Sequence, residues 1–172
     1  MKELLMVRYG EIFLKGLNRP YFFRALVRKI RYALRGMNVS VRIHDGRILI
    51  EGFSDREEAI DRVTRIFGVH SVCPAVEMPK EDFDAICSQA IVMMAGLQGT
   101  FKVNARRSDK RYFMNSPQIN MEMGGRILES NDRLKVDIHH PEHVMNVEIR
   151  DQAYLYVEVI PGVGGMPVGT NG

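Results

Sequence analysis

The chain has 172 residues, of which 45% are apolar and 26% charged, a composition typical of a globular protein rather than a disordered one. No apolar run approaches the roughly 18 residues of a membrane-spanning helix, and the charged opening argues against a secretory signal. Two cysteines, Cys73 and Cys87, are too few for a disulfide framework or a four-cysteine zinc site. We therefore expect a cytoplasmic protein without a metal.

The net charge of +3 is unevenly distributed along the chain. Residues 1–52 carry 11 Lys/Arg against 4 Asp/Glu, whereas residues 53–172 carry 13 against 17. Such asymmetry indicates a polyanion as the partner of the basic part. A solvated cationic face without a ligand is the alternative, and charge alone does not decide between them.

The first 76 residues predict six elements in the order strand, helix, strand, strand, helix, strand. Residues 3–9 are a short strand, and a helix begins at Asn18 or Arg19 and ends before Gly36. Two strands at 39–43 and 48–50 flank Asp45-Gly46, a hairpin turn signal because both positions favour positive φ. A capping box of Ser54 and Glu57 opens the second helix, whose buried stripe is Ile60, Val63 and Phe67, and residues 69–76 form the last strand. This order predicts a ferredoxin-like βαββαβ domain over residues 1–76.

The remaining residues predict a second, smaller α/β domain over residues 77–166, which makes the whole chain an α+β protein. Helices are expected at about 81–97 and from Ser116, and strands at 100–106 and 134–138. A basic loop at 107–115 lies between the first strand and the second helix, and a hairpin at 144–149 and 153–159 completes the domain. Gly124-Gly125 inside a helix indicates close backbone packing. Residues 167–172 read as a linker, since the tail is rich in glycine.

The first helix has a face of like charges. Arg24, Arg28, Arg31 and Arg35 are spaced four, three and four residues apart, so they share one side of the helix. Their mutual repulsion would be relieved by a polyanion, and the planar guanidinium suits phosphate.

A second group of cations begins on a strand and continues into the basic loop: Lys102, Arg106, Arg107, Lys110 and Arg111. Tyr112 and Phe113 follow directly. Cations beside aromatic rings suit single-stranded RNA, whose unstacked bases contact the rings. We expect Phe113 to be a core residue, whereas Tyr112 is equally consistent with a core or a surface role.

No catalytic constellation accompanies these basic surfaces. His139, His140 and His143 surround Pro141 in a turn and do not share one helical face, so we expect no metal site. The glycine-rich tail lacks the Lys-Ser/Thr end of a phosphate-binding loop. Cys73 and Cys87 lie in apolar contexts typical of buried thiols. These features favour a binding module over an enzyme.

The segment from Tyr9 to Phe22 resembles the opening of bacterial and archaeal tRNA 4-thiouridine synthetases. The family pattern is matched at Tyr9, Glu11, Ile12, Leu14, Lys15, Gly16, Asn18, Arg19 and Phe22. Residues 101–110, 119–128, 135–137 and 147–150 look like a THUMP domain, and residues 164–170 look like the linker that precedes the family's nucleotide-binding domain.

The resemblance implies a tRNA-binding function. In that family the ferredoxin-like and THUMP domains hold tRNA, with THUMP capturing the single-stranded 3′ ACCA end. A further domain, opened by Ser-Gly-Gly-x-Asp-Ser, then uses ATP to thiolate the uridine at position eight, in a family associated with 4-thiouridine and thiamine biosynthesis. That motif is absent here, so we expect an inactive fragment of the sulfurtransferase that binds no cofactor itself. Cysteine desulfurase would be a partner only through the missing domain, and a homodimer stays open.

The predicted RNA-binding residues come from two sources. The resemblance assigns RNA contact to Lys15, Arg19, Lys102, Lys110, Asn120 and Arg126. Charge geometry adds Arg24, Arg28, Arg106, Arg107 and Arg111. Two alternatives stay open: the THUMP module of a tRNA methyltransferase, pseudouridine synthase or deaminase, and a ferredoxin-like interaction or ligand-sensing module that binds no RNA.

Overall fold

The structure is a computed structural model that describes residues 1–10 and 19–163. Its elements, in chain order, are β1 (Lys2–Tyr9), α1 (Arg19–Ala33), β2 (Ser40–His44), β3 (Arg47–Glu51), α2 (Arg56–Thr64), β4 (Val69–Met78), α3 (Phe83–Met94), β5 (Gly99–Arg107), α4 (Ser116–Ser130), β6 (Leu134–Val136), β7 (His143–Ile149), β8 (Ala153–Tyr156) and β9 (Ile160–Pro161).

The chain divides into two compact units, and the boundary between them lies within β4. Among the described residues, the N-terminal unit comprises 4–10, 19–74 and 158–163, and the C-terminal unit comprises Met1–Glu3 and Ala75–Val157. The boundary therefore lies two residues before the end of the predicted 1–76 domain. The stretch after Val157, which the sequence analysis placed in the domain over 77–166, returns to the N-terminal unit, where Ile160 pairs with Val72.

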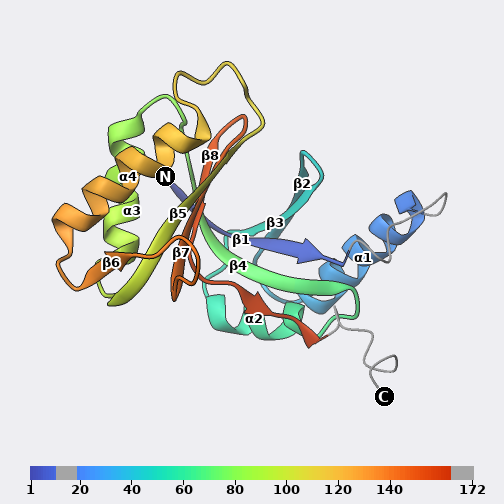
Figure 1. The fold of residues 1–172 in the computed structure, drawn as a ribbon. Helices are drawn as coiled ribbons and strands as arrows, with labels where there is room; N and C mark the ends of the chain where they lie inside the picture. The colour runs from blue at the N-terminus through green and yellow to red at the C-terminus, as the bar shows by residue number, and fades with distance from the viewer. Residues whose placement is uncertain (11–18, 164–172) are drawn as a thin grey trace. The chain divides into compact units, whose positions relative to one another are not determined.

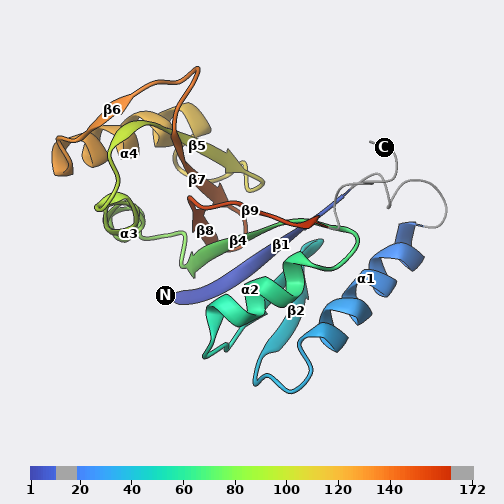
Figure 2. The same ribbon diagram turned by 90° about the horizontal axis from the view of Figure 1, so that it is seen from below.

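The N-terminal unit has the predicted βαββαβ arrangement. Its strands lie in the order β2-β3-β1-β4, and β3 runs antiparallel to both β1 and β2. Helices α1 and α2 cover one face of these strands, as Figure 2 shows. The helices fold this way because their apolar residues recur at helical spacing and close a core with the strands. Members of that core include Leu5, Val7, Ile30, Ile48 and Val63.

The hairpin between β2 and β3 turns at Asp45-Gly46, as predicted. Both residues have positive φ, 55° at Asp45 and 77° at Gly46, which matches the right-handed twist of the flanking strands. The hydroxyl of Tyr9 donates to the carbonyl oxygen of Gly46 at 2.5 Å and ties the turn to the end of β1.

Two details predicted for α2 are wrong. Asp55 rather than Ser54 caps the helix, because its carboxylate accepts from the backbone N–H of Glu58 at 3.0 Å. Phe67 does not join the buried stripe with Ile60 and Val63, and 53% of it is exposed. The reason is that α2 ends at Thr64, so helical spacing no longer applies at position 67.

The C-terminal unit places its strands in the order β4-β8-β7-β5-β6. Strand β5 runs parallel to β6 and β7, whereas β7 and β8 form the predicted antiparallel hairpin. Helices α3 and α4 lie side by side over one face of these strands (Figure 1). As predicted, Phe101, Val103 and Ala105 of β5 point into the core. Asn115 and Gln118 form a reciprocal capping box that starts α4 directly after the basic loop.

Close packing does not explain Gly124-Gly125. A Cβ atom at Gly124 would meet only Val103 Cγ2 at 3.9 Å, and one at Gly125 would meet nothing within 4 Å. The expectation of tight backbone contact was wrong because α4 approaches β5 at ordinary van der Waals distance at this point.

Candidate nucleic-acid interface

The first cationic surface is the basic helix face, which we define as Arg24, Arg28 and Arg31 of α1 together with Arg35, which lies two residues beyond the end of the helix at Ala33, so the predicted helical spacing does not extend to it. All four are exposed, and α1 contains no acidic residue. Two of these side chains also contact other residues of the N-terminal unit. Arg31 Nη2 donates to the carbonyl of Val41 at 3.3 Å, and the Arg35 guanidinium lies 3.8 Å from the centre of the Tyr32 ring. The face therefore carries positive charge that no side chain of its own helix neutralises.

The two other cations predicted near this face are not described in full. Lys15 lies outside the described residues. Arg19 begins α1, and its side chain lies outside the described part as well. The structure thus leaves Arg24 and Arg28 as the described members of the predicted set on this helix.

Exposed aromatic rings accompany the basic helix face; the sequence analysis did not single out Tyr21 or Tyr32, and it expected Phe67 to be buried. Tyr21, Tyr32 and Phe67 are 58%, 66% and 53% exposed. The ammonium of Lys29 lies 6.0 Å from the centre of the Phe67 ring. Tyr21 and Tyr32 fall outside the apolar stripe of α1. Their positions in the helical repeat could therefore have predicted from the sequence that both rings are exposed. Rings beside cations can stack unpaired bases.

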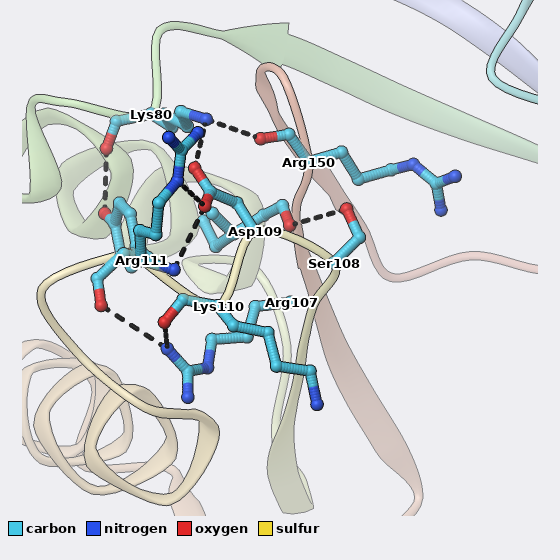
Figure 3. Close-up of polar contacts among 9 residues, drawn as sticks. Lys80, Arg107, Ser108, Asp109, Lys110, Arg111 and Arg150 are labelled. Carbon is cyan, nitrogen blue, oxygen red and sulfur yellow. Dashed lines mark hydrogen bonds and ion pairs between the residues drawn. The ribbon is translucent and has the colours of Figure 1, made fainter.

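The second cationic surface is the basic loop, residues 107–115, which is organised around Asp109 (Figure 3). The Asp109 carboxylate accepts from Lys80 Nζ at 2.8 Å, and from the backbone N–H and Nε of Arg111 at 3.0 and 3.3 Å. Lys80 also donates to the carbonyl of Arg150 at 2.8 Å. The hydrogen bond from Lys80, followed by that from the Arg111 backbone, lowers the pKa of Asp109 to about 2. A single carboxylate thus ties the loop to two distant segments of the same unit.

Arg107 and Tyr112 brace the same loop from within. Arg107 Nη1 donates to the carbonyls of Lys110 and Tyr112 at 3.0 and 3.4 Å, and the Tyr112 hydroxyl donates to the carbonyl of Lys80 at 2.8 Å. Tyr112 is half-buried, and this burial raises its pKa to about 12. The side chains of Arg107 and Tyr112 thus make hydrogen bonds that hold the loop, whereas those of Arg106 and Lys110 are exposed.

Phe113 is not the core residue that the sequence analysis expected. It is 68% exposed, and its ring contacts Tyr112 and Phe83 at centroid distances of 4.9 and 6.1 Å. Tyr112 takes the anchoring position instead, because its hydroxyl reaches a backbone carbonyl that a phenylalanine ring has no group to bind.

Three predicted RNA-binding residues of this unit have other contacts. Lys102 is half-buried on β5. The side-chain oxygen of Asn120 accepts from the backbone N–H of Ala105 at 2.8 Å, which joins α4 to β5. Arg126 pairs with Asp84 at 2.8 Å and Glu122 at 3.0 Å, and these hydrogen bonds raise its pKa. The positive charge of Arg126 is therefore largely compensated.

The sequence analysis did not single out Lys80, whose side chain holds the basic loop through Asp109. It is isolated from other cations in the sequence, and only folding brings it to Asp109 and Arg150. The sequence feature that could have drawn attention to Lys80 is its position directly after Pro79, just before the helical segment.

The two cysteines are buried, as predicted. Burial raises the pKa of the Cys87 thiol to about 11, which disfavours the thiolate that sulfur chemistry requires. Within residues 1–10 and 19–163, no three His, Cys, Asp or Glu side chains group as metal ligands. No helix in that same part of the chain is long and apolar enough to cross a membrane.

Comparison with known families assigns both units. The family model described as the ThiI ferredoxin-like domain matches residues 4–73, and the THUMP domain model matches residues 75–158. This chain is a ThiI ferredoxin-like domain followed by a THUMP domain. The basic helix face thus belongs to the ThiI ferredoxin-like domain, and the basic loop belongs to the THUMP domain.

Individual relatives agree with this assignment along the whole chain. A probable tRNA sulfurtransferase from Clostridium acetobutylicum is 47% identical over 174 residues, which cover 100% of this chain and 45% of that protein. A 4-thiouridine synthetase solved with RNA and ATP is 32% identical with a TM-score of 0.83, over 100% of this chain and 45% of that one. PH1313 from Pyrococcus horikoshii is 30% identical with a TM-score of 0.79, over 98% and 58% of the two chains. The present chain spans about half the length of these relatives.

Proposed function

We propose that this ThiI ferredoxin-like and THUMP chain binds tRNA in the cytoplasm. In this proposal the basic helix face contacts phosphates of the acceptor stem, and the basic loop contacts the unpaired 3′ ACCA end. Phosphate contacts position the RNA, and contacts to exposed bases supply recognition.

The observation that carries the proposal is the braced basic loop. Lys110 is exposed on a loop whose backbone is held by Asp109 and Arg107, and Arg106 is exposed just before it on β5, where it pairs with Glu148 of β7. A loop that is already ordered loses less conformational entropy when it binds a phosphate chain. The likeness over the full chain to a 4-thiouridine synthetase solved with RNA supports the choice of RNA as the polyanion.

We further propose that the bound tRNA is presented for thiolation of the uridine at position eight by a catalytic region outside residues 1–172. ATP would bind in that region, and a cysteine desulfurase would deliver sulfur there. The buried Cys73 and Cys87 support this division, because neither thiol is placed to accept sulfur. A homodimer in which the basic helix face contacts the tRNA held by the partner chain is part of the same proposal.

The test is binding of the purified chain to a tRNA with and without its 3′ ACCA, across a salt series. We expect affinity to fall steeply with salt, because each neutralised phosphate releases counterions, and to fall again when the end is removed. Binding that ignores the end would refute end recognition by the THUMP domain. Absence of binding at low salt would refute the proposal and favour a ferredoxin-like module that binds no RNA.

The THUMP module of a tRNA methyltransferase, pseudouridine synthase or deaminase is less well supported. The ThiI ferredoxin-like match over residues 4–73 favours the thiouridine family. A catalytic motif of another class encoded directly after this segment would reverse that preference.

A further inference from the structure

A small hollow lies in the N-terminal unit next to the basic helix face, and we call it the aromatic hollow. Residues of α1 at helical spacing, Phe22, Leu26 and Lys29, line it on one side. The turn between α2 and β4, with Phe67 and Gly68, also lines it. The hollow is therefore built by the packing of α1 against a turn that is distant in the sequence.

The hollow has room for one flat ring system. Its volume is about 120 Å³, which equals that of about four water molecules at roughly 30 Å³ each. Pockets that enclose whole small-molecule ligands are larger, at about 300–1,000 Å³. The occupant is therefore a group of the size of a single base or side chain, and not a complete cofactor.

Two glycines hold the shape of the hollow. The backbone N–H of Gly10 donates to the carbonyl of Gly68 at 3.1 Å, which joins the end of β1 to the turn before β4. Gly68 has a φ of 105°, and a Cβ atom there would meet Leu26 Cδ1 at 3.4 Å. Any other residue at position 68 would strain this turn. The hollow thus needs little ordering before it takes an occupant.

Two exposed phenylalanine rings and one ammonium group line the hollow. Phe22 is 43% exposed and Phe67 is 53% exposed. The ring of Tyr21 meets that of Phe22 edge-on at 5.7 Å, and the ammonium of Lys29 lies 6.0 Å from the centre of the Phe67 ring. A base can stack on such rings while the ammonium binds the phosphate attached to it.

The charge of the hollow favours a nucleotide over an apolar side chain of a protein partner. Among the described residues that line it, Lys29 is charged and none is acidic. Lys29 directly follows Arg28 of the basic helix face. An RNA strand that follows this face therefore brings its next phosphate to Lys29 and its base to the hollow. An apolar side chain would fill the same space but leave the charge of Lys29 unused.

We propose that the aromatic hollow takes one unpaired base of the tRNA, outside the 3′ end, which stacks against Phe22 and Phe67 while its phosphate contacts Lys29. The proposal rests on tRNA binding by the chain as proposed above. It adds that the N-terminal unit holds a base and not phosphates alone.

The first experiment measures the affinity of the whole chain for a tRNA transcript without its 3′ ACCA, over a salt series. Phe22→Leu and Phe67→Leu should each weaken binding about tenfold at every salt concentration, because they remove a ring but no charge. Lys29→Gln should instead lower the slope of log affinity against log salt by about one. Ile43→Ala is the matched control, since Ile43 is 46% exposed in the same unit and does not line the hollow.

Urea unfolding checks that each variant is folded. Unchanged affinity in Phe22→Leu or Phe67→Leu overturns the proposal. A lower salt slope in these two variants also overturns it, because the rings would then be supporting phosphate contacts and not stacking a base.

The second experiment observes the stacked base directly. The chain contains no tryptophan, so Phe67→Trp places a single indole at the hollow. A base stacked on the indole quenches its fluorescence, so the same tRNA should quench Phe67→Trp and leave Ile43→Trp unchanged. Equal fluorescence of Phe67→Trp with and without saturating tRNA overturns the proposal.

The two proposals fail in distinguishable ways. If the chain binds the tRNA with steep salt dependence but neither the leucine variants nor the indole responds, the base subsite is refuted and RNA binding stands. If the wild-type chain binds no tRNA at low salt, both are refuted.

Discussion

The two cationic surfaces of this chain present positive charge in physically different ways. On the basic helix face, the guanidinium groups of Arg24, Arg28 and Arg31 project from α1 with no acid on the helix, and their positions follow from helical spacing. On the basic loop, an acid is the organising group: Asp109 orients Lys80 and Arg111, and Arg107 holds the loop backbone. The basic helix face supplies a positive electrostatic field, whereas the basic loop supplies cations in an arrangement that is fixed before the ligand binds.

The difference shows that counting charges is a poor guide to recognition. Charge geometry assigned RNA contact to Arg107, and the family resemblance assigned it to Arg126. In the structure Arg126 is paired with two carboxylates, and Arg107 donates to the loop backbone. A field attracts any polyanion and weakens with salt. A preorganised loop can select one part of an RNA, so the two surfaces should respond differently to substitution.

The largest expected effect compares charge reversal on the two surfaces. Arg106→Glu with Lys110→Glu should weaken tRNA binding about 100-fold and abolish its dependence on the 3′ end, since each lost charge-assisted contact costs about tenfold. Arg24→Glu with Arg28→Glu should lower the slope of log affinity against log salt by about two, with the end dependence retained. Fluorescence anisotropy over a salt series measures both. Indistinguishable behaviour of the two double variants would contradict the comparison.

The next effect tests whether the ordered conformation of the basic loop, and not only its charge, contributes to RNA binding. Asp109→Asn removes a negative charge beside phosphate-binding cations, so a purely electrostatic loop would bind RNA more tightly. We expect about tenfold weaker binding instead, because an amide offers one uncharged acceptor oxygen in place of the two carboxylate oxygens that bind Lys80 and Arg111. Asp132→Asn, the same charge change at an exposed position of this unit, is the control and should not weaken binding. Tighter binding by Asp109→Asn would show that the brace has no role in recognition.

A smaller effect follows from the ionisation of Asp109. Its pKa in the folded chain is about 2, below its ordinary value of 3.8, so its contribution to stability is present above pH 4 and is lost as pH falls from about 4 to about 2. At pH 3 the carboxylate should still be mostly ionised. The amide resonance of Arg111, which donates to Asp109, reports this in an NMR titration. A midpoint near 3.8 would mean that the brace does not form in solution.

The smallest effect concerns the stability of α1. Arg28→Glu replaces a repulsive i,i+4 pair with Arg24 by an attractive one and should stabilise the helix by about 0.3–0.5 kcal/mol while weakening RNA binding. Urea unfolding and tRNA affinity are measured on the same variant. A lower free energy of unfolding would show that repulsion between Arg24 and Arg28 does not destabilise the helix. Unchanged affinity would place α1 outside the RNA contact surface.

Much of the fold follows from local pattern. Apolar periodicity located the helices and strands of both units, and the positive φ that Asp45-Gly46 tolerates located the hairpin. The order of these elements determined the ferredoxin-like arrangement, because few topologies bury the apolar faces of two helices against four short strands. The ends of the elements were harder to predict from the sequence, as the capping by Asp55 and the exposure of Phe67 show. The reason is that adjacent residues are nearly equally suited to begin or end a helix.

The sequence by itself determined which residues are cationic and that Arg24, Arg28 and Arg31 share a face of α1, since helical spacing is a local property. Only the tertiary structure decided which cations are available to a ligand. Asp109 meets Lys80 across 29 residues, and Arg126 meets Asp84 across 42. Tyr112 is anchored and Phe113 is exposed for the same reason, because Lys80 offers its carbonyl to one ring and not to the other. Contacts over such separations depend on how helices and strands pack, which no local pattern encodes.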